Sequence, residues 1–223
     1  MSSPAEVDPA FPAVVLCDYG KVLADFDRAR TAALFEEGLG RPLPPDGARL
    51  LDQLLGPFEA GELDPSTFLD RAREALALAD EAAEAAFLRA WCGILWTLDD
   101  TVALMRRVAA RPRTVVHVVT NTDPLRLAFA REGLGLADLF REVTASFEDG
   151  VTPKGRDSSM WQVARARATA SLGEEPALVV GIDDLAGNLE PALADGTLDH
   201  GVVHSDAAGT AAELAGLGLL DPA

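Results

Sequence analysis

The sequence has few positive charges. Its 223 residues include 19 Lys and Arg against 36 Asp and Glu, which gives a formal net charge of −17. Proteins that bind nucleic acids or anionic membranes need clustered basic side chains to compensate phosphate groups. The charge therefore argues against both kinds of partner. A small phosphorylated substrate stays compatible with it, because a bound cation can reverse the local field.

Cysteine and long apolar runs are also scarce. The two cysteines, Cys17 and Cys92, fall in a strand pattern and a helical pattern, so we expect buried free thiols, as in a reducing cytoplasm. Residues 1–13 have no basic patch followed by an apolar run, unlike a secretory signal. No segment has the roughly 18 uninterrupted apolar residues of a membrane span. These features predict a cytoplasmic protein whose first ten or so residues form a loose tail.

Lysine occurs only at Lys21 and Lys154, while arginine supplies every other basic side chain. A chain that otherwise uses arginine retains lysine where a compact ammonium is needed, although chance is a rival explanation. Both lysines fall in loops that stand out for other reasons.

The rest of the chain is organised around residues 13–27. The apolar run from Ala13 to Cys17 predicts a buried strand that ends at Asp18. Gly20 permits a tight turn directly after it. Open α/β sheets bind ligands at the C-terminal ends of their strands. Asp18 is therefore placed to bind a metal or attack an electrophile, unless it only caps the loop backbone.

Residues 28–97 have helical periodicity. Asp25 and Asp27 are interpreted mainly as capping and hinge residues, with Asp27 as the N-cap of the first helix. Asp64 with Pro65 is a further helix start. The aromatic residues at helical spacing predict the core of a small helical lobe rather than a cofactor site. Helices are expected over 28–37, 48–55, 65–79 and 83–95.

From Asp99 onward, strands and helices alternate. Apolar runs predict strands over 113–119, 143–146, 177–182 and 201–204. Helical patterns alternate with them, over 100–110, 124–133, 158–170, 188–194 and 207–214. This alternation predicts a mostly parallel sheet with helices on both faces. The expected fold class is α/β, with a Rossmann-like core of residues 11–27 and 98–223 and an inserted all-helical cap of residues 28–97.

Polar groups follow three of the predicted strands, and a lysine loop precedes a later helix. They are Asp18, Thr120 with Asn121, Asp183 with Asp184, and Lys154. The C-terminal ends of parallel strands share one edge, so these groups can converge. Three carboxylates near one point repel each other unless a cation intervenes, and such oxygen ligands suit Mg²⁺. Each group alone also has an ordinary structural explanation, as a helix cap, a turn or a solvated lysine.

The order of these groups resembles the haloacid dehalogenase-like (HAD) hydrolases. That family has an apolar strand ending in an Asp nucleophile, matched by VVLCDYGKVL, and a Thr or Ser at a strand end, matched by VVTNTD. It also has a Lys ahead of a helix and an acidic pair with a downstream Asn, the latter matched by VVGIDDLAGNLEPA. The stretch FEAGELDPSTFL resembles part of the family's helical cap. The first motif is similar to that of a capped subgroup that reads D-x-G.

The resemblance implies a role for each matched residue. Asp18 would attack phosphorus and form an aspartyl-phosphate, and Thr120 and Lys154 would bind the transferring phosphoryl group. Mg²⁺ would be held by Asp18, the carbonyl of Gly20, and Asp184 with Asp183 close by. The residues expected to contact the substrate are Gly20, Lys21, Asn121 and Arg126.

Three positions depart from the family pattern. Most phosphatases of the family carry a general acid two residues after the nucleophile, where this chain has Gly20. General acid–base help is typically worth about 10²–10⁴-fold, so the leaving group must be good, another group must protonate it, or turnover is slow. The third motif usually reads Lys-Pro, whereas this chain has Pro153 before Lys154. Arg126 stands where the subgroup tends to have a His.

The sequence thus predicts a Mg²⁺-dependent phosphatase of a small phosphorylated metabolite, similar to a sugar phosphate. One alternative is a catalytically impaired protein that binds a phosphorylated ligand or a protein partner. A 2-haloacid dehalogenase is a further alternative, which Asp183 and Asp184 disfavour because that chemistry needs no Mg²⁺. The oligomeric state stays open.

Overall fold

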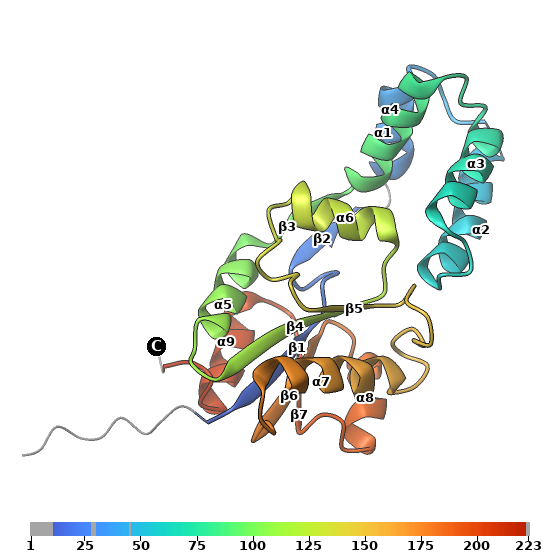
Figure 1. Cartoon of the computed structure of the whole chain (residues 1–223). Coiled ribbons are helices and arrows are strands. Elements are labelled where there is room, and N and C mark those ends of the chain that lie inside the picture. Colours follow the sequence, from blue (N-terminus) through green and yellow to red (C-terminus); the bar gives the residue numbers. More distant parts are fainter. Residues whose placement is uncertain (1–10, 28–29, 45, 222–223) are drawn as a thin grey trace, which may run out of the picture.

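A five-stranded parallel sheet forms the centre of the protein (Figure 1). The computed structural model describes residues 11–27, 30–44 and 46–221. Within them the strand order is β5-β4-β1-β6-β7. The strands are β1 (Ala13–Cys17), β4 (Thr114–Thr120), β5 (Val143–Ala145), β6 (Leu178–Asp183) and β7 (His200–Val203). The tail expected at residues 1–10 and the helix start expected at Arg28 lie outside the described residues.

The register of β1 determines where the polar groups lie. Cys17 pairs with Val118 of β4 on one side and with Ile182 of β6 on the other. The three strands run in parallel, so the residues that follow them leave the sheet at the same edge. This edge brings the predicted site groups together, as expected for an open α/β sheet.

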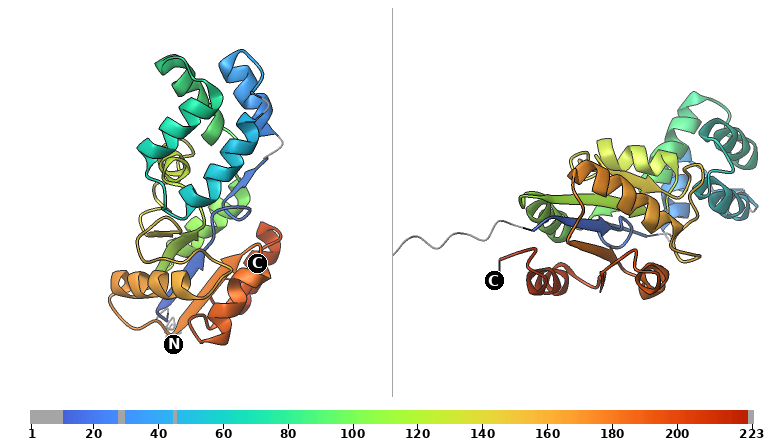
Figure 2. Two further views of the ribbon diagram at one scale, coloured as in Figure 1. Left: turned by 90° about the vertical axis from the view of Figure 1, so that its right-hand side faces the viewer. Right: turned by 60° about the horizontal axis from the view of Figure 1, so that its bottom comes forward.

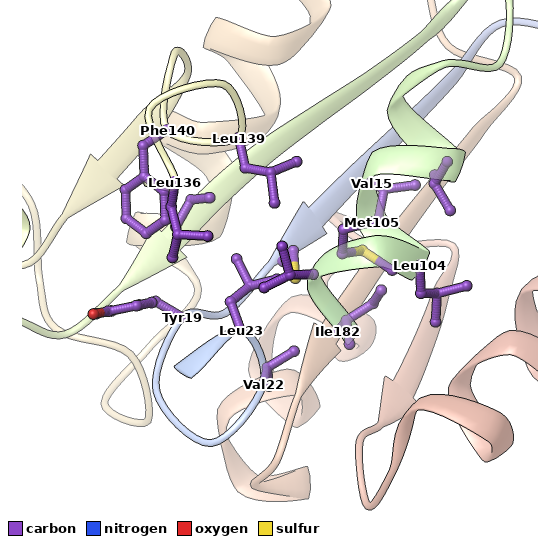
Figure 3. Close-up of a cluster of buried hydrophobic side chains, with 14 of the residues drawn as sticks. Val15, Tyr19, Val22, Leu23, Leu104, Met105, Leu136, Leu139, Phe140 and Ile182 are labelled. Atoms are coloured by element: carbon purple, nitrogen blue, oxygen red, sulfur yellow. The ribbon is translucent and has the colours of Figure 1, made fainter. Parts of the chain in front are cut away.

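Helices cover both faces of the sheet, as predicted. One face carries α5 (Asp99–Ala109), α6 (Pro124–Glu132) and α9 (Ala207–Gly216), and the other carries α7 (Ser159–Leu172) and α8 (Ala186–Ala194). Val15 and Cys17 pack into the first cluster and Leu16 into the second, following the alternation of a strand. Figure 3 shows the first cluster, where Leu104 and Met105 of α5 lie near Val15 and Ile182.

Four helices form a bundle apart from the sheet (Figure 2). They are α1 (Arg30–Leu39), α2 (Gly47–Glu59), α3 (Pro65–Leu76) and α4 (Glu81–Cys92). Their aromatic residues pack on one another, with the rings of Phe58 and Phe68 stacked at 4.1 Å between centroids. The bundle therefore has its own apolar core, which confirms the interpretation of these aromatics. Asp64 caps α3 through the backbone N–H groups of Ser66 and Thr67, also as predicted.

A two-stranded ribbon connects the bundle to the sheet, and the sequence analysis missed it. The antiparallel strands β2 (Ala24–Phe26) and β3 (Leu95–Thr97) pair Phe26 with Leu95. The prediction that Leu95 belongs to a helix is wrong, because α4 already ends at Cys92 with Gly93 as its C-cap. The apolar spacing continues through Ile94 and Leu95, so the pattern alone could not show where the helix stops.

The bundle also contacts the core at two places besides the ribbon. Leu125 and Phe129 of α6 pack against its aromatic core. At its other end, the hydroxyl of Ser146 donates to the backbone carbonyl of Glu59 over 2.5 Å. Gly61 lies so close to the core that a Cβ there would be 2.3 Å from the carbonyl oxygen of Phe147, and its φ is +73°. Only glycine fits this contact.

None of the helices in the described ranges is long and apolar enough to cross a membrane.

His117 is a fully buried titratable side chain in β4. Its Nε2 atom lies 2.9 Å from the Thr144 hydroxyl, and its Nδ1 atom lies 3.9 Å from a carboxylate oxygen of Glu142. Burial, aided by the positive charge of Arg167, lowers the pKa of His117 from 6.5 to about 4. At pH 7 the ring is therefore neutral in both the folded and the unfolded chain.

We expect this buried histidine to weaken the fold in acid. Between pH 6.5 and 4 only the unfolded chain binds the extra proton, so the free energy of unfolding falls as pH falls, by about 2 kcal/mol from pH 7 to pH 5. Urea unfolding at both pH values checks this in wild type and His117→Gln, where that part of the slope should disappear. The control His200→Gln removes a half-exposed histidine and should keep the slope; an equal slope in all three proteins contradicts the prediction.

Candidate active site

Asp18 lies at the end of the central strand with its carboxylate fixed in place. Its backbone N–H donates to the carbonyl of Ile182 over 2.8 Å. Its Oδ1 atom accepts a 2.6 Å hydrogen bond from the backbone N–H of Tyr19. The side chain is buried. A buried carboxylate at the centre of the sheet edge needs a positive partner.

Lys154 is that partner. Its ammonium lies 2.7 Å from Oδ1 of Asp18 and 2.6 Å from Oδ2 of Asp183, and its side chain is 1% exposed. Burial by itself lowers the pKa of Lys154, but the two carboxylates outweigh burial and raise it. The lysine is therefore charged. The order Pro153-Lys154, reversed from the family pattern, still brings the ammonium to Asp18.

Asn121 holds the lysine loop against the sheet. Its Oδ1 atom accepts the backbone N–H of Lys154 over 2.9 Å, and its Nδ2 atom donates to the carbonyl of Lys154 over 3.4 Å. Thr120, one residue earlier at the end of β4, is buried beside this contact. The loop after β4 thus positions the lysine loop, and both line one cleft with Asp18.

The two acidic residues after β6 have different surroundings. Asp183 is fully buried, and its Oδ1 atom accepts hydrogen bonds from the Leu185 backbone N–H and from Nδ2 of Asn188, over 2.9 and 2.8 Å. Its other oxygen is paired with Lys154. Asp184 is only partly buried and lines the cleft. Asp183 is therefore held by the protein, whereas Asp184 is presented to the cleft.

The electrostatics of the three carboxylates reflect their crowding. Burial raises the pKa of Asp18 to about 7, an effect that Lys154 opposes and Asp183 reinforces. Burial and the neighbouring Asp183 also raise the pKa of Asp184. A cation among these groups would relieve the repulsion and favour their charged forms.

The acidic cluster fits a hard divalent cation. One oxygen each from Asp18, Asp183 and Asp184 lie within 4.8 Å of one another. Carboxylate oxygens, joined by backbone carbonyls and water, are the ligands that Mg²⁺ takes in proteins. Gly20, whose carbonyl was expected to join them, lines the same cleft. The donor set present therefore suits Mg²⁺.

A cleft of about 310 Å³ joins this cluster to the helical bundle. Core residues around it are Asp18, Gly20, Thr120, Asn121, Lys154 and Asp184, and Glu59 reaches it from the end of α2. The sequence-predicted residues Lys21 and Arg126 line it too. Eight of the nine predicted site residues thus line the cleft. The ninth, Asp183, accepts a hydrogen bond from Lys154, so all nine lie close together.

Arg126 is held at the boundary between the core and the bundle. Its guanidinium stacks over the ring of Trp91 at 4.3 Å. It lies 3.5 Å from the buried carboxylate of Asp123 and 3.7 Å from the carboxylate of Glu59. Asp123 also accepts a 3.2 Å hydrogen bond from the indole of Trp91. This cluster fixes where Arg126 enters the cleft.

Lys21 lies in the tight turn that Gly20 permits. Its φ is 61°, its ammonium pairs with the carboxylate of Asp25, and it lies 4.7 Å from the centre of the Phe26 ring. Hydrogen bonding from Lys21 lowers the pKa of Asp25. Asp25, interpreted from sequence as a hinge residue, thus pairs with a lysine of the cleft.

Tyr19, Glu59 and Asn188 are among the residues of the cleft that sequence reasoning missed. Asn188 could have been assigned, because the acidic-pair motif includes a downstream Asn. Tyr19 has a buried hydroxyl without a hydrogen-bond partner among the described residues, and burial raises its pKa, so it stays a proton donor. No local pattern distinguishes Glu59 from the other acidic residues of the bundle.

The fold and this edge define an α/β protein with an acidic site at the ends of parallel strands and a helical insertion above it. The fold is that of the HAD enzymes. A HAD family enzyme from Bacteroides thetaiotaomicron, in complex with magnesium and inorganic phosphate, is 20% identical with a TM-score of 0.64 over 86% of this chain and 93% of that one. A predicted HAD-like family hydrolase from Porphyromonas gingivalis is 20% identical with a TM-score of 0.62, over 88% of this chain and 93% of that one.

An L-2-haloacid dehalogenase from Xanthobacter autotrophicus, with chloropropionic acid covalently bound, is also similar. It is 19% identical with a TM-score of 0.51, over 95% of this chain and 85% of that one. No family model matches the sequence, and no curated protein matches it significantly. The likeness is therefore one of fold, and the chemistry has to be argued from the site.

Proposed function

We propose that this protein is a Mg²⁺-dependent phosphatase that hydrolyses a small phosphorylated metabolite through an aspartyl-phosphate on Asp18. The observation that carries the proposal is the buried Lys154 ammonium, 2.7 Å from Asp18 and 2.6 Å from Asp183 at the edge of the sheet. Phosphoryl transfer depends mainly on positioning and on stabilising charge, and this arrangement provides both. The fold shared with a HAD enzyme that binds magnesium and phosphate supports it.

In this proposal Asp18 attacks phosphorus and the leaving-group oxygen departs, after which water hydrolyses the acyl-phosphate. Lys154 favours the ionised form of Asp18 and, with Thr120, stabilises the equatorial phosphoryl oxygens. Asn121 holds the lysine loop in position, and its amide lies at the cleft. Asp183 accepts hydrogen bonds from Lys154 and Asn188 and so holds both side chains in position.

Mg²⁺ would be held by Asp18, the Gly20 carbonyl and Asp184, with Asp183 close by. When bound, it would neutralise charge on the phosphoryl group. The partly exposed position of Asp184 supports its role as a ligand.

We further propose that residues 28–97 act as a cap whose closure excludes water and determines the substrate. The substrate would be similar to a sugar phosphate, as for the alpha-D-glucose-1-phosphate phosphatase of the D-x-G subgroup. Two residues after Asp18, where most phosphatases of the family have a general acid, this chain has Gly20. This supports a substrate whose leaving group departs without that acid. Lys21 and Arg126 would contact the part of the substrate nearest the phosphate. The two buried free thiols suit the cytoplasm, where we place the protein.

Phosphate release from a panel of sugar, nucleotide and acid phosphates tests this function. The full chain is assayed with excess Mg²⁺ and with EDTA. We expect release from at least one phosphomonoester that stops with EDTA and returns when excess Mg²⁺ is added. Absence of release from the whole panel by folded protein would contradict the phosphatase.

A second candidate is a protein that binds a phosphorylated ligand without turning it over. The glycine at position 20, where most phosphatases of the family carry an acid, favours it. Tight binding of a phosphomonoester that is recovered intact, equally in wild type and Asp18→Asn, would support this candidate over the enzyme.

A further inference from the structure

A second cavity, of about 170 Å³, adjoins the cleft from inside the helical bundle. Its walls come from α1, α2 and the loop between them, from the end of α4, and from Arg126 of α6. They are mainly apolar, with side chains of Phe35, Leu43, Leu51, Leu55, Trp91 and Ile94. We call this cavity the apolar chamber.

The apolar chamber and the catalytic cleft share two wall residues, Ile94 and Arg126. The groups that handle phosphate, such as Asp18 and Lys154, line the cleft and not the chamber. Arg126 lies at the boundary between the two spaces, where its stacking on Trp91 and its contact with Asp123 hold it in place. A ligand whose phosphate lies beside Asp18 would therefore reach the chamber with its far end.

We propose that the apolar chamber binds an apolar group, the size of one ring or a short branched chain, at the far end of the substrate's leaving group. This rests on the proposed function, because it concerns the leaving group of the same phosphomonoester. A cavity of about 150 Å³ lined by Leu, Ile and Phe is large enough for benzene. The sugar-like part of the proposed leaving group would lie beside Arg126 and Glu59, and an apolar group attached to it would lie within the bundle.

Small side chains keep the chamber open. Ala32 of α1 and Ala48 of α2 both line it. A leucine at either position would fill part of the space that the ligand's apolar group needs. Ala32, Ala33 and Ala48 are all exposed, but Ala33, the next residue on α1, does not line the chamber, so Ala33→Leu is a matched control.

The test compares methyl phosphate with benzyl phosphate. Their dissociation constants are measured by calorimetry with Mg²⁺ on the Asp18→Asn protein, which cannot form the aspartyl-phosphate. Burial of apolar surface is worth about fourfold in affinity per methylene, so we expect benzyl phosphate to bind at least tenfold tighter. Adding Ala32→Leu or Ala48→Leu should reduce this preference to about twofold or less, whereas adding Ala33→Leu should leave it in place. Thermal unfolding shows that each variant is folded.

The outcomes separate this inference from the phosphatase. Three results would contradict the proposal that the chamber binds an apolar group. They are equal affinity for the two phosphates, no binding of either, and a preference that survives both Ala32→Leu and Ala48→Leu. Turnover of the panel is measured on wild type alone. Tighter binding of benzyl phosphate by a protein that releases no phosphate supports binding in the chamber and contradicts the phosphatase. Phosphate release without this preference supports the phosphatase and contradicts binding in the chamber.

Discussion

Replacement of Asp18 by asparagine should lower phosphate release by about 10⁴-fold or more, because the nucleophile is lost while the groups around it stay. The variant should be no less stable than wild type. Asp18 is one of three crowded carboxylates, and burial raises its pKa to about 7. Removing its charge relieves repulsion, and Lys154 keeps Asp183 as a partner. Single-turnover phosphate release and thermal unfolding measure the two effects.

Asp157→Asn is the matched control for this experiment. Asp157 is an exposed aspartate just before α7, and its carboxylate accepts the backbone N–H of Ser159. Its loss should leave phosphate release within about twofold of wild type, as expected for a surface position away from the cleft. Phosphate release by Asp18→Asn at more than one hundredth of the wild-type rate would contradict the covalent mechanism.

Replacement of Lys154 by methionine should destabilise the protein by about 3–5 kcal/mol in EDTA, because it leaves Asp18 and Asp183 buried without a cation. Addition of Mg²⁺ should restore part of this stability, since the metal supplies the missing positive charge. Phosphate release should fall by about 10²–10³-fold even with Mg²⁺, as when one group that stabilises transition-state charge is lost. Urea unfolding with EDTA and with Mg²⁺ measures the stability.

The chain's other lysine provides the comparison. Lys21 pairs with Asp25 at the surface, with 42% of its side chain exposed. Lys21→Met should therefore cost at most about 1 kcal/mol, and its stability should not depend on Mg²⁺ more than that of wild type. If Lys154→Met unfolds at the same urea concentration as Lys21→Met in EDTA, the buried ammonium does not neutralise the acidic cluster.

The parallel sheet and the convergence of the acidic groups could be predicted because each depends on a local pattern. The apolar run before Asp18 is long enough to specify a buried strand, and so is the run before Asp183. Once both strands are parallel neighbours, as their register shows, the two carboxylates must leave at one edge. A few residues of sequence therefore fix this part of the site.

Other features depend on contacts between distant segments, which no local pattern encodes. The bond of Asn121 to the Lys154 backbone spans 33 positions, and the contact of Glu59 with Arg126 joins the bundle to the core. The ribbon was missed for a related reason. Its strands are three residues long, which is too short for a periodic signal, and each gains its structure only by pairing with the other.

The ribbon also offers a site at which the bundle could be removed by protein engineering. Phe26 and Leu95 face each other across it, so the chain between them leaves and re-enters the core at one paired position. A two-residue Asn-Gly turn could close the ribbon as a hairpin, with Asp18, Lys154, Asp183 and Asp184 all retained in the shortened protein. Leu125 and Phe129 would then need polar replacements, because they pack against the bundle. A different helical bundle could be inserted at the same junction. Because we propose that the bundle determines the substrate, such an exchange would change substrate selectivity without moving the acidic cluster.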